Sequence, residues 1–373
     1  MKIGIDARFY GPYVGGGGLG RYTHELLKQL QEIDTQNRYL VFLNREGFDA
    51  FQPKSPNFEK RLADVRWYTL AEQLKMPRII DREHLDLIHY PHWNVPLFSR
   101  TPFVTTIHDL ILLDERDSAI QATTLPRPLY NLKRLGYRIV LHHALFKSRS
   151  LIAVSNFTKS RILAHFPRLS KDKVKMIYEG GPGTWGHEPE TNLAPKGPYF
   201  LYVGNAYPHK NLESLLHAFS FFQKAHPEVK LVLVGREGHF YNQLKKELEE
   251  IDVPSDSVIF TGFVPDASLS NLYQHATLYL FPSRHEGFGL PPLEAMAHGV
   301  PVAASKTSSL PEILGDAALY FDPDNLEDMV RVMETALSDE TLRQTLTQKG
   351  YEKIKAYSWR TMAQETLNIY LHR

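Results

Sequence analysis

The sequence predicts an α/β protein made of two doubly wound, Rossmann-like domains. Its length of 373 residues exceeds what a single hydrophobic core usually supports. In both halves, short apolar segments alternate with segments of helical length, which is the pattern of βαβ units around a parallel sheet. A stretch rich in Gly and Pro, which neither helices nor strands tolerate, separates the two series. We expect the domains to face each other, with the carboxyl ends of their strands lining the cleft between them.

The first domain is expected to span residues 1–180. Its strands lie, in chain order, in KIGIDARF, YLVFLN, LDLIHY, FVTTIHD and SLIAVS, with a helix over about residues 22–31. A linker at 181–198 precedes a second domain at 199–357, whose strands lie in YFLYVGN, VKLVLVG, VIFTGF, LYLFPS, PVAAS and ALYFDP. The last segment, about 358–373, has a helical period and is expected to pack back onto the first domain.

The composition excludes several classes of protein. A hydrophobic fraction of 43% is typical of a globular chain, and the absence of cysteine rules out disulfides, thiolate zinc sites and cysteine nucleophiles. The amino terminus reads MKIGIDARF, a charged and alternating strand rather than a secretion signal. No stretch approaches the roughly 20 apolar residues of a membrane-spanning helix. We therefore expect a cytoplasmic protein.

Positive charge is concentrated in residues 121–175, which carry twelve Lys or Arg and a single acid, Asp172. Within this region the segment 127–149 places Arg134 and Arg138 at helical spacing beside Leu135 and Ile139. One interpretation is peripheral contact with anionic lipid at the inner face of the membrane. The other is a solvated helix face beside an anion-binding cleft. Nucleic acid is not expected as a partner, because no recognition motif or stacking platform is present.

The segment EGFGLPPLEAMAHG, residues 286–299, has the features of a ligand site. Two residues separate it from the apolar strand LYLFPS, and its glycines and prolines are costly inside a regular element. Residues 293–297 are expected to form a helix with Pro292 at or near its first turn. A strand, an irregular loop with a carboxylate and a free helix amino terminus are how α/β proteins build ligand sites.

This segment and its surroundings closely resemble the retaining glycosyltransferases of family 4, which have the GT-B fold. The second domain carries the most specific motifs, VGNAYPHKNLESLLHAF, the run from FTGFVPD to EAMAHG, and SSLPEILGDAALYFDP. The first domain contributes GGGGLGRYTHEL, TTIHDL and AVSNFTKSRI. Within the family, the motifs look most like those of bacterial α-mannosyltransferases that use GDP-mannose to build lipid-linked surface polysaccharide.

The resemblance implies three catalytic residues. Lys210 would contact the diphosphate, where a fixed cation stabilises the charge that develops on the leaving group. Glu286 would lie near the donor sugar and orient its hydroxyls or stabilise cationic character on its ring. His108, at the end of a strand, would contact a hydroxyl of the donor sugar.

The resemblance also implies a larger set of donor contacts. Glu294 would accept hydrogen bonds from the ribose hydroxyls. Phe288, Gly289 and Leu290 would offer backbone N–H groups to the sugar and diphosphate. The full set of donor-binding residues is Gly16, Gly17, Gly18, Asn205, Lys210, Arg236, Gly262, Phe263, Val264, Glu286, Gly287, Phe288, Gly289, Leu290 and Glu294. Ser308 and Ser309 resemble a segment that either approaches the phosphates or orients the loop of Glu286.

The chain departs from the family pattern at Asn205, where many relatives have an arginine as a second cation. Four replacements remain open from the sequence: a protonated His209, the helix amino terminus near 289–292, Arg236, and Arg284.

The function implied is transfer of a hexose, mannose from GDP-mannose, to a hydroxyl of a glycan or lipid-linked acceptor, with retention of anomeric configuration. No metal or other cofactor is expected, because the only Asp-x-Asp, residues 322–324, lies in a late turn. A UDP-hexose such as UDP-glucose is the competing donor. A GT-B-fold sugar-nucleotide epimerase and a non-catalytic sugar-nucleotide-binding protein are the competing classes. GGGGLG also fits a dinucleotide fingerprint, but about seven residues separate it from the strand, which argues against a tight turn.

Overall fold

The chain forms two compact units. The computed structural model describes residues 1–11, 17–115, 123, 126–181 and 193–372. The first unit contains residues 1–110, 125–180 and 358–373, and the second contains 111–124 and 181–357. The sequence prediction placed 111–124 in the first domain, and this is wrong. The short helix α4 (Ile111–Asp114) belongs to the second unit, where the carboxylate of Asp114 lies 3.5 Å from Nε2 of His285 and both side chains are only 6% exposed.

The first unit is built on a seven-stranded parallel sheet in the order β3-β2-β1-β4-β5-β6-β7. The chain starts at the central β1, proceeds to one edge, and returns to β4 beside β1 before it proceeds to the other edge. The carboxyl ends of β1 and β4 therefore form the topological switch point of this sheet. The strands are β1 (Lys2–Asp6), β2 (Arg38–Leu43), β3 (Phe58–Leu62), β4 (Leu87–Tyr90), β5 (Phe103–Ile107), β6 (Ser150–Ala153) and β7 (Val174–Met176).

Two of these strands were not predicted from the sequence. β3 reads FEKRL, in which only Phe58 is buried, and β7 has three residues. Both are edge strands, which pair on one side only and so carry polar residues without the apolar run of a central strand. The apolar periodicity that revealed the central strands is absent from them for this reason.

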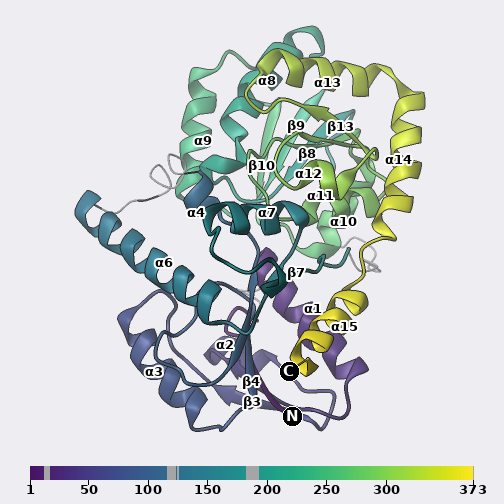
Figure 1. Cartoon of the computed structure of the whole chain (residues 1–373). Helices are drawn as coiled ribbons and strands as arrows, with labels where there is room; N and C mark the ends of the chain where they lie inside the picture. The colour runs from purple at the N-terminus through teal and green to yellow at the C-terminus, as the bar shows by residue number, and fades with distance from the viewer. Residues whose placement is uncertain (12–16, 116–122, 124–125, 182–192, 373) are drawn as a thin grey trace. The chain divides into compact units, whose positions relative to one another are not determined.

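Alternation along β4 directs its side chains to opposite faces of the sheet. Ile88 and Tyr90 belong to a buried cluster with residues of α3 and α6, whereas the buried His89 bonds through Nδ1 to the hydroxyl of Tyr370, 2.6 Å away, in the C-terminal helix α15. That helix packs beside α1 in the first unit (Figure 1). The helices of this unit are α1 (Gly18–Ile33), α2 (Arg45–Ala50), α3 (Leu70–Asp81), α6 (Arg127–Lys147), α7 (Asn156–His165), the 3-10 turn η1 (Lys171–Lys173) and α15 (Trp359–Leu371).

The second unit has a six-stranded parallel sheet in the order β10-β9-β8-β11-β12-β13. Its switch point lies between β8 and β11. The strands are β8 (Tyr199–Val203), β9 (Lys230–Val234), β10 (Val258–Gly262), β11 (Leu278–Phe281), β12 (Val302–Ser305) and β13 (Ala318–Phe321). The helices, besides α4, are η2 (Pro208–Lys210), α8 (Leu212–Ala225), α9 (His239–Glu250), α10 (Asp266–His275), α11 (Leu290–Ala297), α12 (Leu310–Leu314), α13 (Leu326–Ser338) and α14 (Glu340–Ile354).

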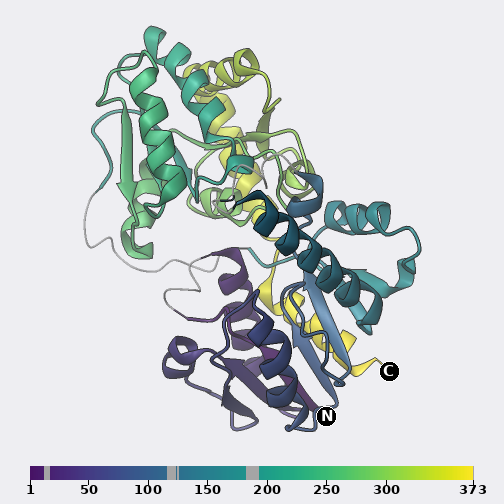
Figure 2. The same cartoon turned by 90° about the vertical axis from the view of Figure 1, so that its left-hand side faces the viewer.

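Helix α6 is a long helix on the outside of the first unit (Figures 1 and 2). Its C-terminal half contributes Leu141, Ala144 and Leu145 to the buried interior. Across the part of the chain that the structure describes, no helix combines the length and the apolar character needed to cross a bilayer.

Candidate active site

Lys210 and Glu286 come together at the switch point of the second sheet. Lys210 ends η2, the turn that follows β8, and Glu286 lies in the loop that follows the neighbouring β11. Nζ of Lys210 lies 2.5 Å from Oε1 of Glu286, and the two side chains are only 15% and 12% exposed. Nζ also lies 5.6 Å from the ring centroid of Phe281. The sheet topology thus unites two residues that are 76 positions apart in the sequence.

Glu286 is held ionised and in a fixed position. Burial alone would raise its pKa, but the ion pair with Lys210 outweighs burial, so the pKa lies below its ordinary value. The N–H of Glu286 donates to Oγ of Ser308, and Oγ of Ser309 donates to the carbonyl oxygens of Glu286 and Phe288. Of the two roles that the sequence left open for the serines, these bonds match the orientation of the Glu286 loop.

The loop ends at a helix amino terminus with few N–H donors. Helix α11 begins at Leu290, three residues earlier than predicted, after Gly289 at φ +101°. A β-carbon at Gly289 would meet Cδ2 of Leu310 at 2.9 Å, so both the backbone angle and the space favour glycine. Pro291 and Pro292 lack N–H groups. Among the described residues, the N–H groups of Gly289 and Leu290 have no hydrogen-bond acceptor and are the donors this turn offers to an anion.

Glu294 lies on α11, with its carboxylate 3.5 Å from the hydroxyl of Tyr273. The carbonyl oxygen of Glu294 accepts from the N–H and Nδ1 of His298 at the end of the helix. Glu294 belongs to α11, whereas Glu286 belongs to the loop before it and pairs with Lys210, so the two glutamates differ in element and in partner.

Other predicted donor residues follow the carboxyl ends of β9 and β10. Gly262 ends β10 at φ +71°, Phe263 is exposed, and Val264 is buried beneath the loop. The guanidinium of Arg236, which follows β9, lies 5.2 Å from the ring centroid of Phe263. These two neighbouring strands therefore present a cation and an aromatic ring side by side.

The structure distinguishes among the replacements for the cation absent at Asn205. Burial, reinforced by Lys210, lowers the pKa of His209 to about 4, so this imidazole is neutral at pH 7. Arg284 donates through Nε to Asp324, 2.8 Å away, which compensates its charge. Asn205 itself accepts from the N–H of Tyr207. Arg236 is the candidate whose side chain lies at the carboxyl end of the sheet beside Phe263.

In the first unit, His108 follows β5 and bonds through both ring nitrogens. Nδ1 lies 2.8 Å from Oε1 of Glu179, and Nε2 lies 3.0 Å from the carbonyl oxygen of Pro91. Burial opposes the charged form, but Glu179 outweighs it and raises the pKa of His108. A contact between His108 and a sugar hydroxyl would require it to exchange one of these bonds. Gly17 precedes α1 and Gly18 begins it, whereas Gly16 lies outside the described residues.

Comparison with known proteins identifies the family. A sequence profile described as "Glycosyltransferase Family 4" matches residues 16–180, and one described as "Glycosyl transferases group 1" matches residues 185–353, so that together they span most of the chain. The chain is a family 4 glycosyltransferase.

Individual proteins resemble this glycosyltransferase over its full length. O-antigen chain mannosyltransferase B of Escherichia coli is 29% identical over 95% of this chain and 95% of its own. Sucrose-phosphate synthase of Thermosynechococcus elongatus superposes with a TM-score of 0.77 at 20% identity, covering 99% of this chain and 98% of the other. HepE of Anabaena, solved with UDP-glucose, superposes with a TM-score of 0.75 at 20% identity and covers 99% of both chains. The predicted GT-B fold class is confirmed.

Sequence reasoning missed one buried residue that contacts His108 in the first unit. Glu179 lies at the predicted boundary between the first domain and the Gly- and Pro-rich linker, where no residue was given a role, yet its carboxylate is buried against His108. No local motif marks it, because its partner lies 71 positions earlier.

The ion pair between His108 and Glu179 predicts a pH-dependent stability of the glycosyltransferase. Because the folded pKa of His108 lies above its ordinary value of 6.5, the stabilisation is complete below pH 6.5 and is lost as the pH rises through the raised pKa. We expect the melting temperature of Glu179→Gln to fall below that of the wild type most at pH 6 and least at pH 9. Circular dichroism melts across this range measure it, with the exposed Glu334→Gln as control. A gap that widens toward pH 9 would contradict the assignment.

Proposed function

We propose that this glycosyltransferase transfers mannose from GDP-mannose, with retention of configuration, to a hydroxyl of a glycan or lipid-linked acceptor during surface polysaccharide biosynthesis. The observation that carries the chemistry is the pairing of Lys210 with Glu286 at the switch point of the second sheet. The observation that favours mannose is the likeness over 95% of the chain to O-antigen chain mannosyltransferase B.

The proposed mechanism relies on a preorganised charge pair. Lys210 retains two further N–H donors after it binds Glu286, and these are available to the leaving diphosphate. As negative charge develops on that phosphate, the fixed ammonium group stabilises the transition state more than the ground state. The N–H groups of Gly289 and Leu290 add donors, and Arg236 supplies the second cation. The acceptor oxygen bonds to the anomeric carbon on the same face from which the phosphate leaves, and the departing phosphate accepts the proton of the acceptor hydroxyl. Attack on that face is the reason that the sugar keeps its configuration.

The proposed reaction requires no metal ion. Within the described residues, no group of three His, Asp or Glu side chains is arranged to hold one. The Asp-x-Asp at 322–324 is a turn in which Asp322 accepts from the N–H of Asp324, and Asp324 pairs with Arg284. We expect dialysis against EDTA to leave the transfer rate within about twofold of its starting value, whereas a loss that Mg²⁺ or Mn²⁺ restores would refute metal independence.

A donor screen with the purified protein tests the proposed function. We expect GDP-mannose to raise the melting temperature and to be hydrolysed slowly in the absence of acceptor, because binding to the folded state alone stabilises it. UDP-glucose, the donor bound in the HepE structure, is the comparison. If UDP-glucose but not GDP-mannose raised the melting temperature and was hydrolysed by the protein, UDP-glucose would be the donor. An isomerised sugar nucleotide would indicate an epimerase, and binding without any turnover would indicate a non-catalytic protein.

The proposed function includes contact of α6 with anionic lipid at the inner face of the membrane. Over residues 127–147 the helix has five Lys or Arg and no acid. Its apolar side chains are unusually exposed for a globular protein: Leu129, Leu132, Leu135 and Ile139 are each 44–64% exposed. Apolar side chains that enter the headgroup region beside cationic side chains are the features of an interfacial helix.

Reversing two charges on α6 tests this contact. We expect Arg134→Glu/Arg138→Glu to abolish sedimentation with vesicles of phosphatidylglycerol and phosphatidylcholine, because each basic residue contributes about 1 kcal/mol at such a surface. The matched control is Lys349→Glu on α14 combined with Lys355→Glu at the C-cap of that helix. It reverses two exposed charges in the second unit and should leave sedimentation unchanged. Equal sedimentation of all three proteins would rule out the contact.

A further inference from the structure

The switch point of the first sheet is lined by aromatic side chains to which neither the donor site nor the membrane contact assigns a role. Phe9 follows β1, and His92 and Trp93 follow the adjacent β4. The loop between β3 and α3 adds Trp67 and Tyr68. Ligands of open α/β sheets bind at the carboxyl ends of strands beside such a switch point. We call these five residues the aromatic shelf.

The rings of the aromatic shelf are in continuous contact. Phe9 and Trp67 stack with their centroids 4.6 Å apart, and the ring of His92 lies 5.5 Å from Phe9 and 4.7 Å from Trp93. The ring of Tyr68 lies 5.5 Å from Trp93. Tyr68 is 52% exposed and the other four side chains are half-buried. The shelf therefore presents aromatic surface to solvent at a position where α/β proteins bind ligands.

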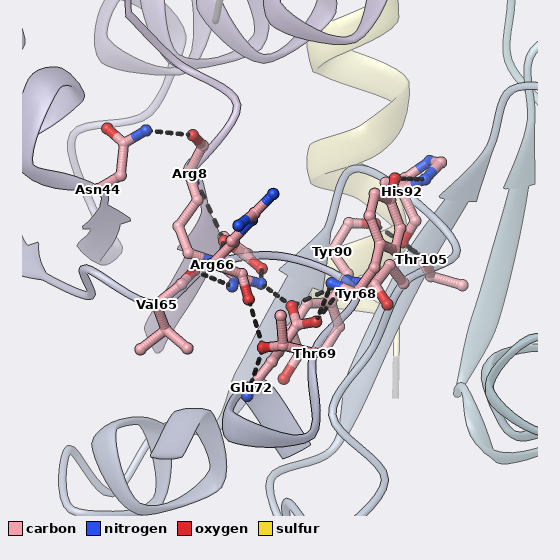
Figure 3. Close-up of polar contacts among 12 residues, drawn as sticks. Arg8, Asn44, Val65, Arg66, Tyr68, Thr69, Glu72, Tyr90, His92 and Thr105 are labelled. Carbon is pink, nitrogen blue, oxygen red and sulfur yellow. Dashed lines mark hydrogen bonds and ion pairs between the residues drawn. The ribbon is translucent and has the colours of Figure 1, made fainter. Parts of the chain in front are cut away.

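Tyr68 is held in a backbone conformation that a residue with a side chain rarely adopts. Its φ is +59°, in the left-handed region. Its N–H donates to Oε2 of Glu72, 2.8 Å away, and its hydroxyl bonds Nε2 of His92, 3.0 Å away (Figure 3). Strain of this kind persists only where the surrounding structure enforces it, and it is concentrated at functional sites.

A buried charged network enforces this conformation. The guanidinium of Arg8 bonds Asp6 on β1. It also bonds Glu72 on α3, and its Nη1 donates to the carbonyl oxygen of Val65 in the loop of Tyr68 (Figure 3). Nδ2 of Asn94, two residues after His92, donates to both carboxylate oxygens of Glu72. The network thus fixes the loop at Val65 and at Tyr68. Buried ion pairs add little net stability, so we attribute to this one the precise placement of the loop.

The chemistry of the shelf suits a pyranose ring. Tyrosine and tryptophan combine a flat apolar face with a polar edge and lose little conformational entropy on binding, which matches the C–H face and hydroxyl rim of a sugar. Burial keeps His92 neutral by lowering its pKa to about 3, so it adds no cation for a phosphate. Within the described residues, Nε1 of Trp67 and Nδ1 of His92 lack hydrogen-bond partners, and both atoms lie at the rings that form the shelf.

We propose that the aromatic shelf is a saccharide subsite that stacks a pyranose ring of the acceptor, and that Trp67 and Tyr68 are residues that position it. The acceptor is then a glycan that already carries sugar, rather than a bare lipid phosphate. This inference rests on the proposed function for the direction of transfer, but the binding of saccharide to the shelf is measurable without any donor.

The first experiment titrates the full-length protein with α-1,2-linked mannobiose in the absence of donor. Two of the four tryptophans of the chain, Trp67 and Trp93, lie in the shelf, so we expect a saturable change in tryptophan fluorescence. In Tyr68→Ala the apparent Kd should rise roughly tenfold, the loss expected for one aromatic stacking partner. Because alanine at φ +59° is strained, Tyr68→Gly removes the same ring in a conformation that glycine adopts freely. Phe221→Ala, which removes a 57% exposed ring on α8, is the matched control and should bind as the wild type does.

The second experiment separates positioning from donor chemistry. With GDP-mannose as donor, the KM for mannobiose should rise roughly tenfold in Tyr68→Gly, while hydrolysis of GDP-mannose by water stays within about twofold. Tyr68→Phe keeps the stacking face and should retain most of the affinity. Unchanged Kd and KM in both Tyr68→Gly and Trp67→Ala, or no binding of mannobiose by the wild type, would overturn the proposal. Binding of mannobiose without turnover of GDP-mannose would support the shelf and refute the donor assignment. Saturable quenching by GDP that Tyr68→Gly abolishes would indicate a nucleobase site instead.

Discussion

Replacing Lys210 with methionine should lower kcat by about 10²–10³-fold, the loss expected when one fixed group that stabilises the transition state is removed. Glu286→Gln, which keeps the shape of the side chain and removes its charge, should cause a loss of similar size. The physical reason is that both side chains are more than four-fifths buried and lie 2.5 Å apart, so each fixes the position of the other, and the proposed mechanism uses both at the donor. Transfer rates at saturating donor and acceptor measure the effect.

The same pair complicates the interpretation of single variants. Lys210→Met leaves the buried Glu286 carboxylate without its counter-charge, which costs about 3–5 kcal/mol of stability. A low rate could then reflect unfolding. The double variant Lys210→Met/Glu286→Gln removes both charges, so we expect most of the stability to return while the rate stays low. Lys224→Met, which removes one partner of an exposed pair with Asp252, should change neither quantity. Near-normal turnover in a folded Lys210→Met or Glu286→Gln protein would remove that residue from its assigned role.

Replacing Arg8 with methionine should destabilise the first unit more than any surface change. Arg8 is fully buried between the carboxylates of Asp6 and Glu72, at 2.7 Å from each. Without the guanidinium, two buried carboxylates lose their common counter-charge and the carbonyl of Val65 loses a donor. We expect a cost of about 3–5 kcal/mol. This corresponds to a fall of roughly 10 °C in the melting temperature of a domain of this size.

The control for Arg8 is an arginine that pairs on the surface. Arg331 lies 2.6 Å from Asp328 on α13, and its side chain is 61% exposed, so Arg331→Met should change the melting temperature little. Circular dichroism melts of the three proteins give the comparison. Equal melting temperatures for Arg8→Met and Arg331→Met would show that the buried network does not hold the first unit together.

The donor-site residues could be predicted from the sequence because they lie in short motifs of neighbouring residues. EGFGLPPLEAMAHG begins five residues after the end of a buried apolar strand, and its glycines and prolines mark an irregular loop before a helix. PHKN similarly follows the strand YFLYV. A resemblance in these motifs could name Lys210 and Glu286 as site residues. It could not show that their side chains pair, because that contact depends on β8 and β11 being neighbours in the sheet.

Residues whose role depends on distant partners were beyond sequence reasoning. In the sequence, Glu179 is a polar residue in a Gly-rich segment with no distinguishing motif. Only the fold shows that its carboxylate contacts His108. The sequence left His209 open as a second cation. In the structure, its burial and the nearby Lys210 lower its pKa, so it is neutral at pH 7. The shelf residues Trp67 and Tyr68 follow an edge strand with no apolar periodicity. No neighbouring motif in the sequence predicts that they contact Phe9 and Trp93.

The sequence by itself determined the two parallel sheets, the glycosyltransferase motifs and the loops that bear them, because alternation of apolar strands with helices and the Gly-Pro turns are properties of neighbouring residues. Only the tertiary structure decided the membership of 111–124 in the second unit, the ion pair of Lys210 with Glu286 and the assembly of the aromatic shelf around Arg8. The physical reason is that burial and charge compensation are set by side chains brought together across a sheet, and the order of strands in that sheet is not the order of the chain.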